Sequence, residues 1–156
     1  MLTLWQSVII VSIFMVLVMA AAWALCIKIK NFGYLDFVWS ISFSLVAVAY
    51  FFLSSGWFPR RLLFTAMVCF WSLRLAIHLF NRITAHHPIE DVRYSQLRVE
   101  WAKNLNLKMF LFFQFQALSI PLLTAPFFLV MQNATPQFSL LEIFGSNSLL
   151  PVSCRE

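Results

Sequence analysis

Long apolar runs alternate with short polar segments along most of this 156-residue chain. A helix needs about 20 apolar residues to cross the hydrocarbon core of a bilayer, and four runs meet or approach that length. The runs are Leu4–Ile27, Leu35–Leu53, Leu62–Phe80 and Leu107–Met131. The pattern predicts an all-α fold, a polytopic transmembrane bundle of about four helices over residues 1–137. We expect residues 138–156 to form an irregular or truncated tail, because Gly145–Glu156 shows no periodicity, although Phe138–Phe144 could start another helix or lie in the membrane interface.

Composition agrees with a membrane bundle. The chain is 62% hydrophobic and only 11% charged, with 18 phenylalanines and 6 tryptophans. A soluble domain of this size does not need so much apolar surface. The formal net charge of +5 is typical of basic loops at a membrane surface, so we expect membrane lipids and no nucleic acid as partners.

The distribution of lysine and arginine predicts the orientation. The first connection carries Lys28 and Lys30, and the long third connection, Asn81–Asn106, carries Arg82, Arg93, Arg98 and Lys103. Basic loops face the cytoplasm, so both connections are predicted there and the N-terminus outside.

Arg74 is the one charged side chain in the middle of an apolar run, whereas Asp36 and Lys108 lie at the ends of theirs. Arg74 falls within Leu62–Phe80, where a charge costs about 2.5–3.5 kcal/mol or more. His78 and Arg82 follow at four-residue spacing, so the three share one helical face. We expect Arg74 to face the bundle interior and to meet Asp36, Ser40 or Gln114, which enter from the same side of the membrane. Two interpretations stay open. One is a pocket for a polar or anionic head group, and the other is a structural role, in which Arg74 either pairs with Asp36 or reaches toward lipid phosphates.

The third connection holds further polar side chains. Tyr94 could donate a proton if a basic neighbour lowered its pKa, and Arg93 and Arg98 could supply that field or bind phosphate. Glu90 and Asp91 precede them, although alternating charges in a loop usually form a solvated surface. With three separate cysteines and no His/Cys cluster, the sequence predicts no metal site.

Several of these residues form a familiar pattern. It consists of Trp71, Arg74, Leu75, His78, Arg82 and the segment Glu90-Asp91-x-Arg93-Tyr94, together with the earlier segment Asn31 to Ser40. The pattern resembles the steroid 5α-reductase-like membrane family, in its bacterial branch (domain of unknown function 1295). The resemblance covers roughly residues 25 to 130 and corresponds to the N-terminal half of that family.

The resemblance implies a membrane-embedded reductase that uses NADPH to reduce a carbon–carbon double bond in a lipid or steroid-like substrate. It implies a location in a bacterial inner membrane. Under it, the cofactor is held by Arg74, His78, Arg82 and Arg93, while Tyr94, Glu90 and Asp91 form the catalytic group or order the loop. The substrate or polar pocket is then the one expected from Asp36, Ser40 and Gln114. The family's C-terminal cofactor motif is absent here, so we expect a fragment, or a homo-oligomer or partner that supplies the missing half, with weak or absent NADPH binding by this chain alone.

Two other classes of protein fit the same sequence. A non-catalytic lipid-binding or scaffolding bundle would use the same polar pocket. A small dimeric exporter would need an intramembrane carboxylate for proton coupling, and Asp36, near a helix end, is the one candidate. NADPH binding separates the reductase from both alternatives.

Overall fold

The computed structural model describes residues 3–86 and 89–137. Within these ranges every regular element is a helix, with no strand. The elements are α1 (Leu4–Ile29), α2 (Tyr34–Leu53), α3 (Phe58–His86), α4 (Val92–Glu100), the 3-10 helix η1 (Ala102–Asn104) and α5 (Leu105–Gln132). The predicted all-α fold is confirmed, and the expected tail at 138–156 lies outside the described residues.

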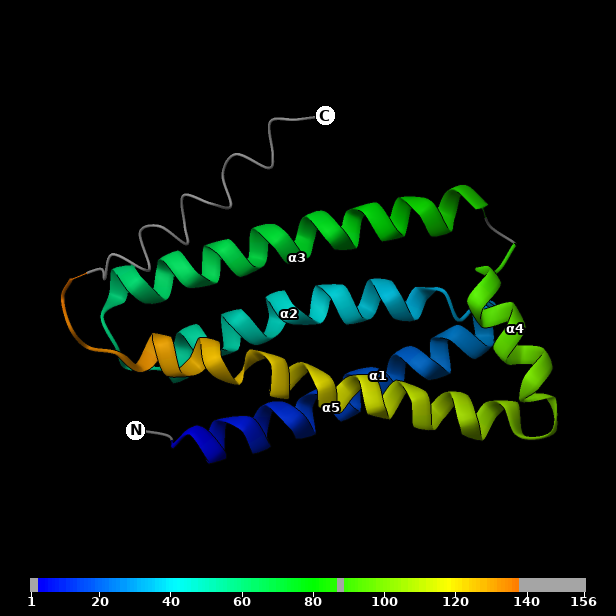
Figure 1. Cartoon of the computed structure of the whole chain (residues 1–156), viewed down its shortest axis with the longest axis horizontal. Helices are drawn as coiled ribbons and strands as arrows, with labels where there is room; N and C mark the ends of the chain where they lie inside the picture. The colour runs from blue at the N-terminus through cyan, green and yellow to red at the C-terminus, as the bar shows by residue number, and fades with distance from the viewer. Residues whose placement is uncertain (1–2, 87–88, 138–156) are drawn as a thin grey trace.

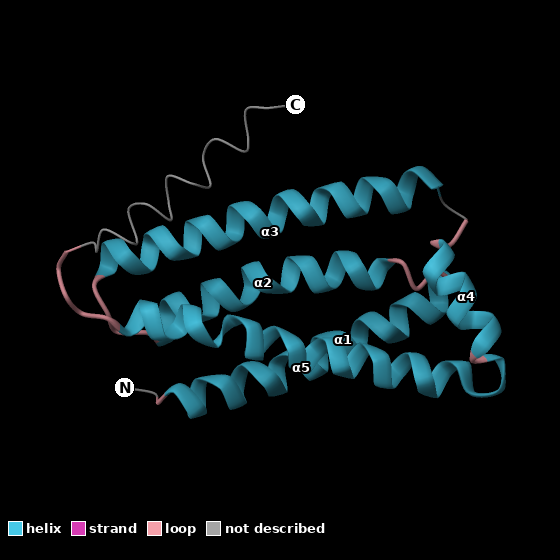
Figure 2. Ribbon diagram, in the orientation of Figure 1, coloured by secondary structure: helices cyan, strands magenta, loops and turns pink. Residues whose placement is uncertain are grey.

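Four long helices lie side by side, and the short α4 crosses one end of the bundle (Figure 1). The α1–α2 turn, the last turn of α3 and α4 all lie at this end, which we call the α4 end. The N-terminus and the α2–α3 turn lie at the opposite end (Figure 2). The first and third connections therefore share one end of the molecule, as the charge pattern predicted.

All four long helices are long and apolar enough to cross a membrane, which indicates a membrane protein. Their bounds match the predicted runs closely, except for α3. This helix runs from Phe58 to His86, so its last turns extend into the segment expected to be a polar connection. The same segment also forms α4, which the sequence interpretation had placed in a loop.

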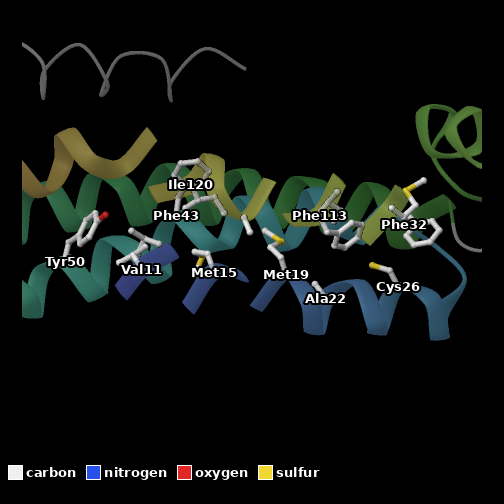
Figure 3. Close-up of a cluster of buried hydrophobic side chains, with 14 of the residues drawn as sticks. Val11, Met15, Met19, Ala22, Cys26, Phe32, Phe43, Tyr50, Phe113 and Ile120 are labelled. Atoms are coloured by element: carbon white, nitrogen blue, oxygen red, sulfur yellow. The ribbon is translucent and has the colours of Figure 1, made fainter. Parts of the chain in front are cut away.

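The core lies mainly between α1, α2 and α5. Met15 and Met19 of α1 and Phe113 of α5 are fully buried, and Figure 3 shows α1 side chains pointing toward rings of the neighbouring helices. Methionine fills such irregular gaps well because its side chain is flexible. Helix α3 packs chiefly on α2 and stays at the edge of the bundle.

Small polar residues join α2 to α3. The Ser72 hydroxyl of α3 donates to the carbonyl oxygen of Ser40, and the Ser44 hydroxyl donates to Ser72 Oγ at 2.9 Å. Ala76, one turn from Ser72, is buried on the same face. Small residues let membrane helices approach closely, so this face decides which side of α3 turns inward.

Candidate functional site

The polar side chains of the α4 end gather around Asp36, in the first turn of α2. Its carboxylate accepts hydrogen bonds from Arg93 Nη2 at 2.7 Å and from the Tyr94 hydroxyl at 2.8 Å. Arg82 Nη2 of α3 lies 3.9 Å from the same carboxylate. Asp36 therefore joins α2, α3 and α4 at one point.

Asp91 begins α4 and extends this network. Its side chain accepts from the Arg93 backbone N–H at 3.0 Å, the N-cap arrangement that aspartate favours. The same carboxylate accepts from Arg93 Nε at 3.1 Å and from Arg82 Nη2 at 3.0 Å. One residue thus starts the helix and also holds the arginine that reaches Asp36.

Glu90 fastens α4 to the α1–α2 turn. It pairs with Arg98 through two hydrogen bonds of 3.0 and 3.1 Å, and it accepts the Phe32 backbone N–H at 2.7 Å. The Arg98 guanidinium also lies over the Phe32 ring, 5.1 Å from its centre. Two-point Arg–carboxylate pairs are stronger and more directional than single hydrogen bonds.

This network changes the acid–base properties of two groups. The hydrogen bond from the Arg93 side chain holds the pKa of Asp91 below its usual value. Burial, and then the negative charge of Asp36, raise the pKa of Tyr94. Tyr94 was expected to need a basic neighbour to become a good proton donor. Arg93 does lie over its ring, 5.7 Å from the centre, and lowers its pKa, but burial and the Asp36 carboxylate outweigh that effect. In this arrangement it is a weaker acid than free tyrosine.

A cavity of about 260 Å³ lies beside the network. Its polar lining comes from Asn31, Arg82, His86, Glu90 and Asp91, and its apolar lining includes Ile83, Ile89 and Val92. Across the described ranges, no group of three His, Cys, Asp or Glu side chains could hold a metal ion. The lining donors and carboxylates instead form a polar site with an apolar edge.

The expected inward position of Arg74 is wrong. Arg74 and His78 are exposed, and neither has a hydrogen bond or ion pair with any residue that the structure describes. At 3.6 residues per turn, Arg74 lies about 200° around the helix from both Ser72 and Ala76, which pack on α2. Close packing of small residues therefore overrides the polar stripe, and Asp36 takes its arginines from α4 and the end of α3.

The predicted polar pocket forms only in part. Ser40 is buried one turn from Asp36, but its hydroxyl donates to the Asp36 carbonyl oxygen within α2. Gln114 does not hydrogen-bond to the network, because both polar atoms of its amide are buried with no hydrogen-bond partner among the described residues. Gln116 lies with Asp36 and Trp39 on a second, smaller cavity instead.

Sequence reasoning missed three features of the site. It did not foresee that Arg98 pairs with Glu90, and it named Asn31 only within a motif. It also read Asp91 as a loop residue, although an aspartate directly before a helix-forming segment is a common N-cap signal. No sequence signal pairs Glu90 with the backbone of Phe32, which is 58 residues away.

Comparison with known proteins supports a family assignment. A family described as a protein of unknown function (DUF1295) matches residues 22–152 of the chain. No curated protein and no solved structure matches it. Since the match covers most of the sequence, including every residue of the network around Asp36, this protein belongs to the DUF1295 family.

Proposed function

We propose that this protein is a membrane-embedded, NADPH-dependent reductase that acts on a carbon–carbon double bond of a lipid or steroid-like substrate. The observation that carries the proposal is the exposed pair Arg74 and His78 on α3, in line with Arg82 at the α4 end. A cation without a partner on a membrane helix is costly, so such residues usually serve a ligand or a pathway. The motif resemblance to steroid 5α-reductase-like proteins supplies the reaction class.

The spacing of Arg74, His78 and Arg82 suits binding of the phosphate groups of NADPH. Four residues of helix rise about 6 Å, so Arg74, His78 and Arg82 present donors at regular intervals along one face. Arginine and protonated histidine bind phosphate oxygens through charge-assisted hydrogen bonds. When bound, NADPH supplies a hydride to the double bond. For the nicotinamide end, the cavity beside Arg82 is too small, since ligand sites usually measure about 300–1,000 Å³.

The network around Asp36 has a positioning role under this proposal. Arg93 and Tyr94 both bind Asp36, and Asp91 fixes Arg93, so α4 is held across the end of α3 next to Arg82. Glu90, Asp91 and Tyr94 are therefore engaged with other side chains of the protein. Proton transfer to substrate by any of them would require one of these contacts to open.

Titration of the purified protein in nanodiscs with NADPH tests the proposal, with NADPH fluorescence as the signal. We expect weak but saturable binding, and at least a tenfold loss of affinity in the double variant Arg74→Gln/His78→Gln. Lys103→Gln is the control, because Lys103 is an exposed cation at the same end of the molecule, outside the stripe. Equal NADPH affinity in the double variant and the parent protein would contradict the proposal.

A non-catalytic scaffold is the second candidate. It is favoured by one observation: Asp36, Glu90 and Asp91 all have arginine partners, an arrangement typical of structural ion-pair networks. Complete absence of NADPH binding, with the fold intact, would favour this function.

A further inference from the structure

The cavity at the α4 end combines features that point to a ligand other than a dinucleotide. Asn31 is 2% exposed and lines this cavity. Its side-chain oxygen accepts the Gly33 backbone N–H at 2.8 Å, while its amide nitrogen has no hydrogen-bond partner in the part of the chain that the structure describes. Asn31 is buried as a residue and lines the cavity, so its amide N–H groups remain available to a bound acceptor there.

Two further donors line the same cavity. Arg82 uses one terminal nitrogen, Nη2, for its contacts with Asp91 and Asp36, which leaves the other guanidinium N–H groups for a ligand. His86 Nδ1 lies 2.8 Å from the Arg82 carbonyl oxygen and so donates to it. The opposite ring nitrogen of His86 is left free, and it donates when the imidazole is protonated.

The carboxylates of the lining do not make the cavity a cation site. Asp91 accepts from Arg82 and Arg93, and Glu90 accepts from Arg98 and the Phe32 N–H. Each negative charge is therefore balanced by an arginine. Apart from the second ring nitrogen of His86, the groups left without partners are N–H donors of Asn31 and Arg82. A phosphate oxygen is the acceptor that such donors favour, and a phosphate also pairs with an imidazolium.

The position of Arg82 and His86 along α3 indicates that the ligand also has an apolar part. A helix needs about 20 residues to cross the hydrocarbon core, so a span that begins at Leu62 ends near Asn81. Arg82 and His86 therefore lie at the level of the lipid head groups. Ile89 is 74% exposed and Val92 is 70% exposed, and both line the cavity. Exposed aliphatic side chains at this level suit contact with the glycerol and upper acyl region of a lipid.

We propose that this cavity binds a phosphate ester through Asn31, Arg82 and His86, with Ile83, Ile89 and Val92 against its apolar part. The phosphate comes from a phospholipid head group or from a free phosphate ester. This site is separate from the proposed cofactor contacts of Arg74 and His78, although Arg82 contributes to both. The test therefore leaves Arg82 unchanged.

Native mass spectrometry of the detergent-purified protein provides the measurement. The probes are dioleoyl phosphatidylglycerol, dioleoylglycerol with the same acyl chains but no phosphate, and glycerol 3-phosphate with no acyl chains. We expect phosphatidylglycerol to bind at least tenfold more tightly than dioleoylglycerol. Asn31→Asp keeps the acceptor for the Gly33 N–H and removes the donor, and His86→Ala removes the ring. Each substitution should weaken phosphatidylglycerol binding at least fivefold, while Lys103→Gln leaves it unchanged.

The probes also separate the two sources. Tighter binding of phosphatidylglycerol than of glycerol 3-phosphate supports a lipid ligand, and comparable binding of both, still dependent on His86, supports a free phosphate ester. His86 is exposed, so His86→Ala remains informative if Asn31→Asp fails to fold. Equal binding of dioleoylglycerol and phosphatidylglycerol, or phosphate binding that does not change in His86→Ala, would overturn the proposal. NADPH affinity is measured separately, so its absence leaves this result intact.

Discussion

Two neighbouring side chains reach Asp36 with different degrees of exposure. The Arg93 side chain is 61% exposed, whereas Tyr94 is 4% exposed. An exposed ion pair contributes about 0–1 kcal/mol, because water and salt screen it. A hydrogen bond to a charged group is worth about 1.5–3 kcal/mol when the donor is buried. The phenol hydroxyl should therefore contribute more to holding α4 than the arginine charge does.

This difference predicts the ranking of two substitutions. Tyr94→Phe should lower the free energy of unfolding by about 1.5 kcal/mol, because it removes the buried donor to Asp36 and keeps the ring. Arg93→Gln should cost less than about 1 kcal/mol. Detergent-induced unfolding in mixed micelles measures both. A larger loss in Arg93→Gln than in Tyr94→Phe would show that charge, not the buried hydroxyl, holds this contact.

At the scale of elements, α4 depends on Asp91 being ionised. The hydrogen bond from Arg93 lowers the pKa of Asp91 from its usual value of 3.8. A carboxyl group whose pKa is depressed by folding stabilises the folded state above its unfolded pKa, and this contribution is lost as pH falls through the folded value. Protonation would weaken both the N-cap and the ion pairs to Arg82 and Arg93.

Protonation of Asp91 should loosen α4 before the rest of the bundle. As pH falls below about 3.8, hydrogen-exchange protection of the α4 amides, corrected for intrinsic exchange, should fall before that of α1 and α5. In Asp91→Asn the α4 amides should already be less protected at neutral pH, and the acid-dependent loss should be smaller. Unchanged acid sensitivity of α4 in Asp91→Asn would assign the effect to another group.

The opposite end of the bundle depends on a close backbone contact. A Cβ atom added at Gly56 would lie 2.1 Å from the carbonyl oxygen of Met131 and 2.8 Å from that of Asn133. The end of α5 is also fixed there, since the Trp57 N–H and Arg60 both donate to the Asn133 carbonyl oxygen. This end therefore packs main chain directly against main chain.

Gly56→Ala should thus cost about 2 kcal/mol or more, because the backbone of one segment must move. Gly33→Ala is the matched control: its added Cβ would lie 2.9 Å from the Asn31 side-chain oxygen, with no backbone atom as close. We expect a smaller loss there. Detergent unfolding midpoints of the two variants provide the comparison, and equal midpoints would contradict the argument.

The elements were easier to predict than their contacts. Apolar runs of membrane length indicate α1, α2, α3 and α5 directly, because bilayer thickness fixes the helix length. The orientation of α3 could not be read in the same way. Arg74 suggested an inward polar face, but Ser72 and Ala76 are small enough for close packing on α2 and turn Arg74 outward. Asp36 was expected in the site. Two of its partners lie on α4, and this helix was not predicted because the alternating charges of its segment are typical of a solvated loop.

At the scale of the whole molecule, the two ends differ in their number of lysines and arginines, which predicts an orientation. The α4 end carries Lys28, Lys30 and Lys103 in addition to its paired arginines, whereas the described part of the opposite end carries Arg60 and Arg61. Under the positive-inside rule this end should face the cytoplasm. In a protein whose native cysteines are replaced, a membrane-impermeant thiol reagent should label Ser55→Cys from outside and Lys103→Cys only from the cytoplasmic side. The reverse pattern would invert the proposed topology.

The proposed reductase activity depends on enclosure as well as on binding. Hydride transfer requires the reacting atoms at about 3–3.5 Å in a fixed orientation, with water kept away. In the described ranges, α3 contacts mainly α2, and its Arg74 face is open. Water or lipid next to that face would leave a bound nicotinamide without walls, even where Arg74 and His78 held its phosphates.

We therefore expect the 156-residue chain by itself to bind NADPH weakly and to leave an enone lipid or steroid unreduced. The measurement is NADPH consumption, followed by fluorescence, in nanodiscs with the substrate added and with empty nanodiscs as the control. A dimer would change the expectation if a second copy covered the Arg74 face and enclosed the cofactor. Consumption should then rise with protein density per disc and fall in Arg74→Gln/His78→Gln. Substrate-dependent consumption above the control in discs that hold one copy would show that the open face of α3 is sufficient for catalysis and that the enclosure argument is wrong.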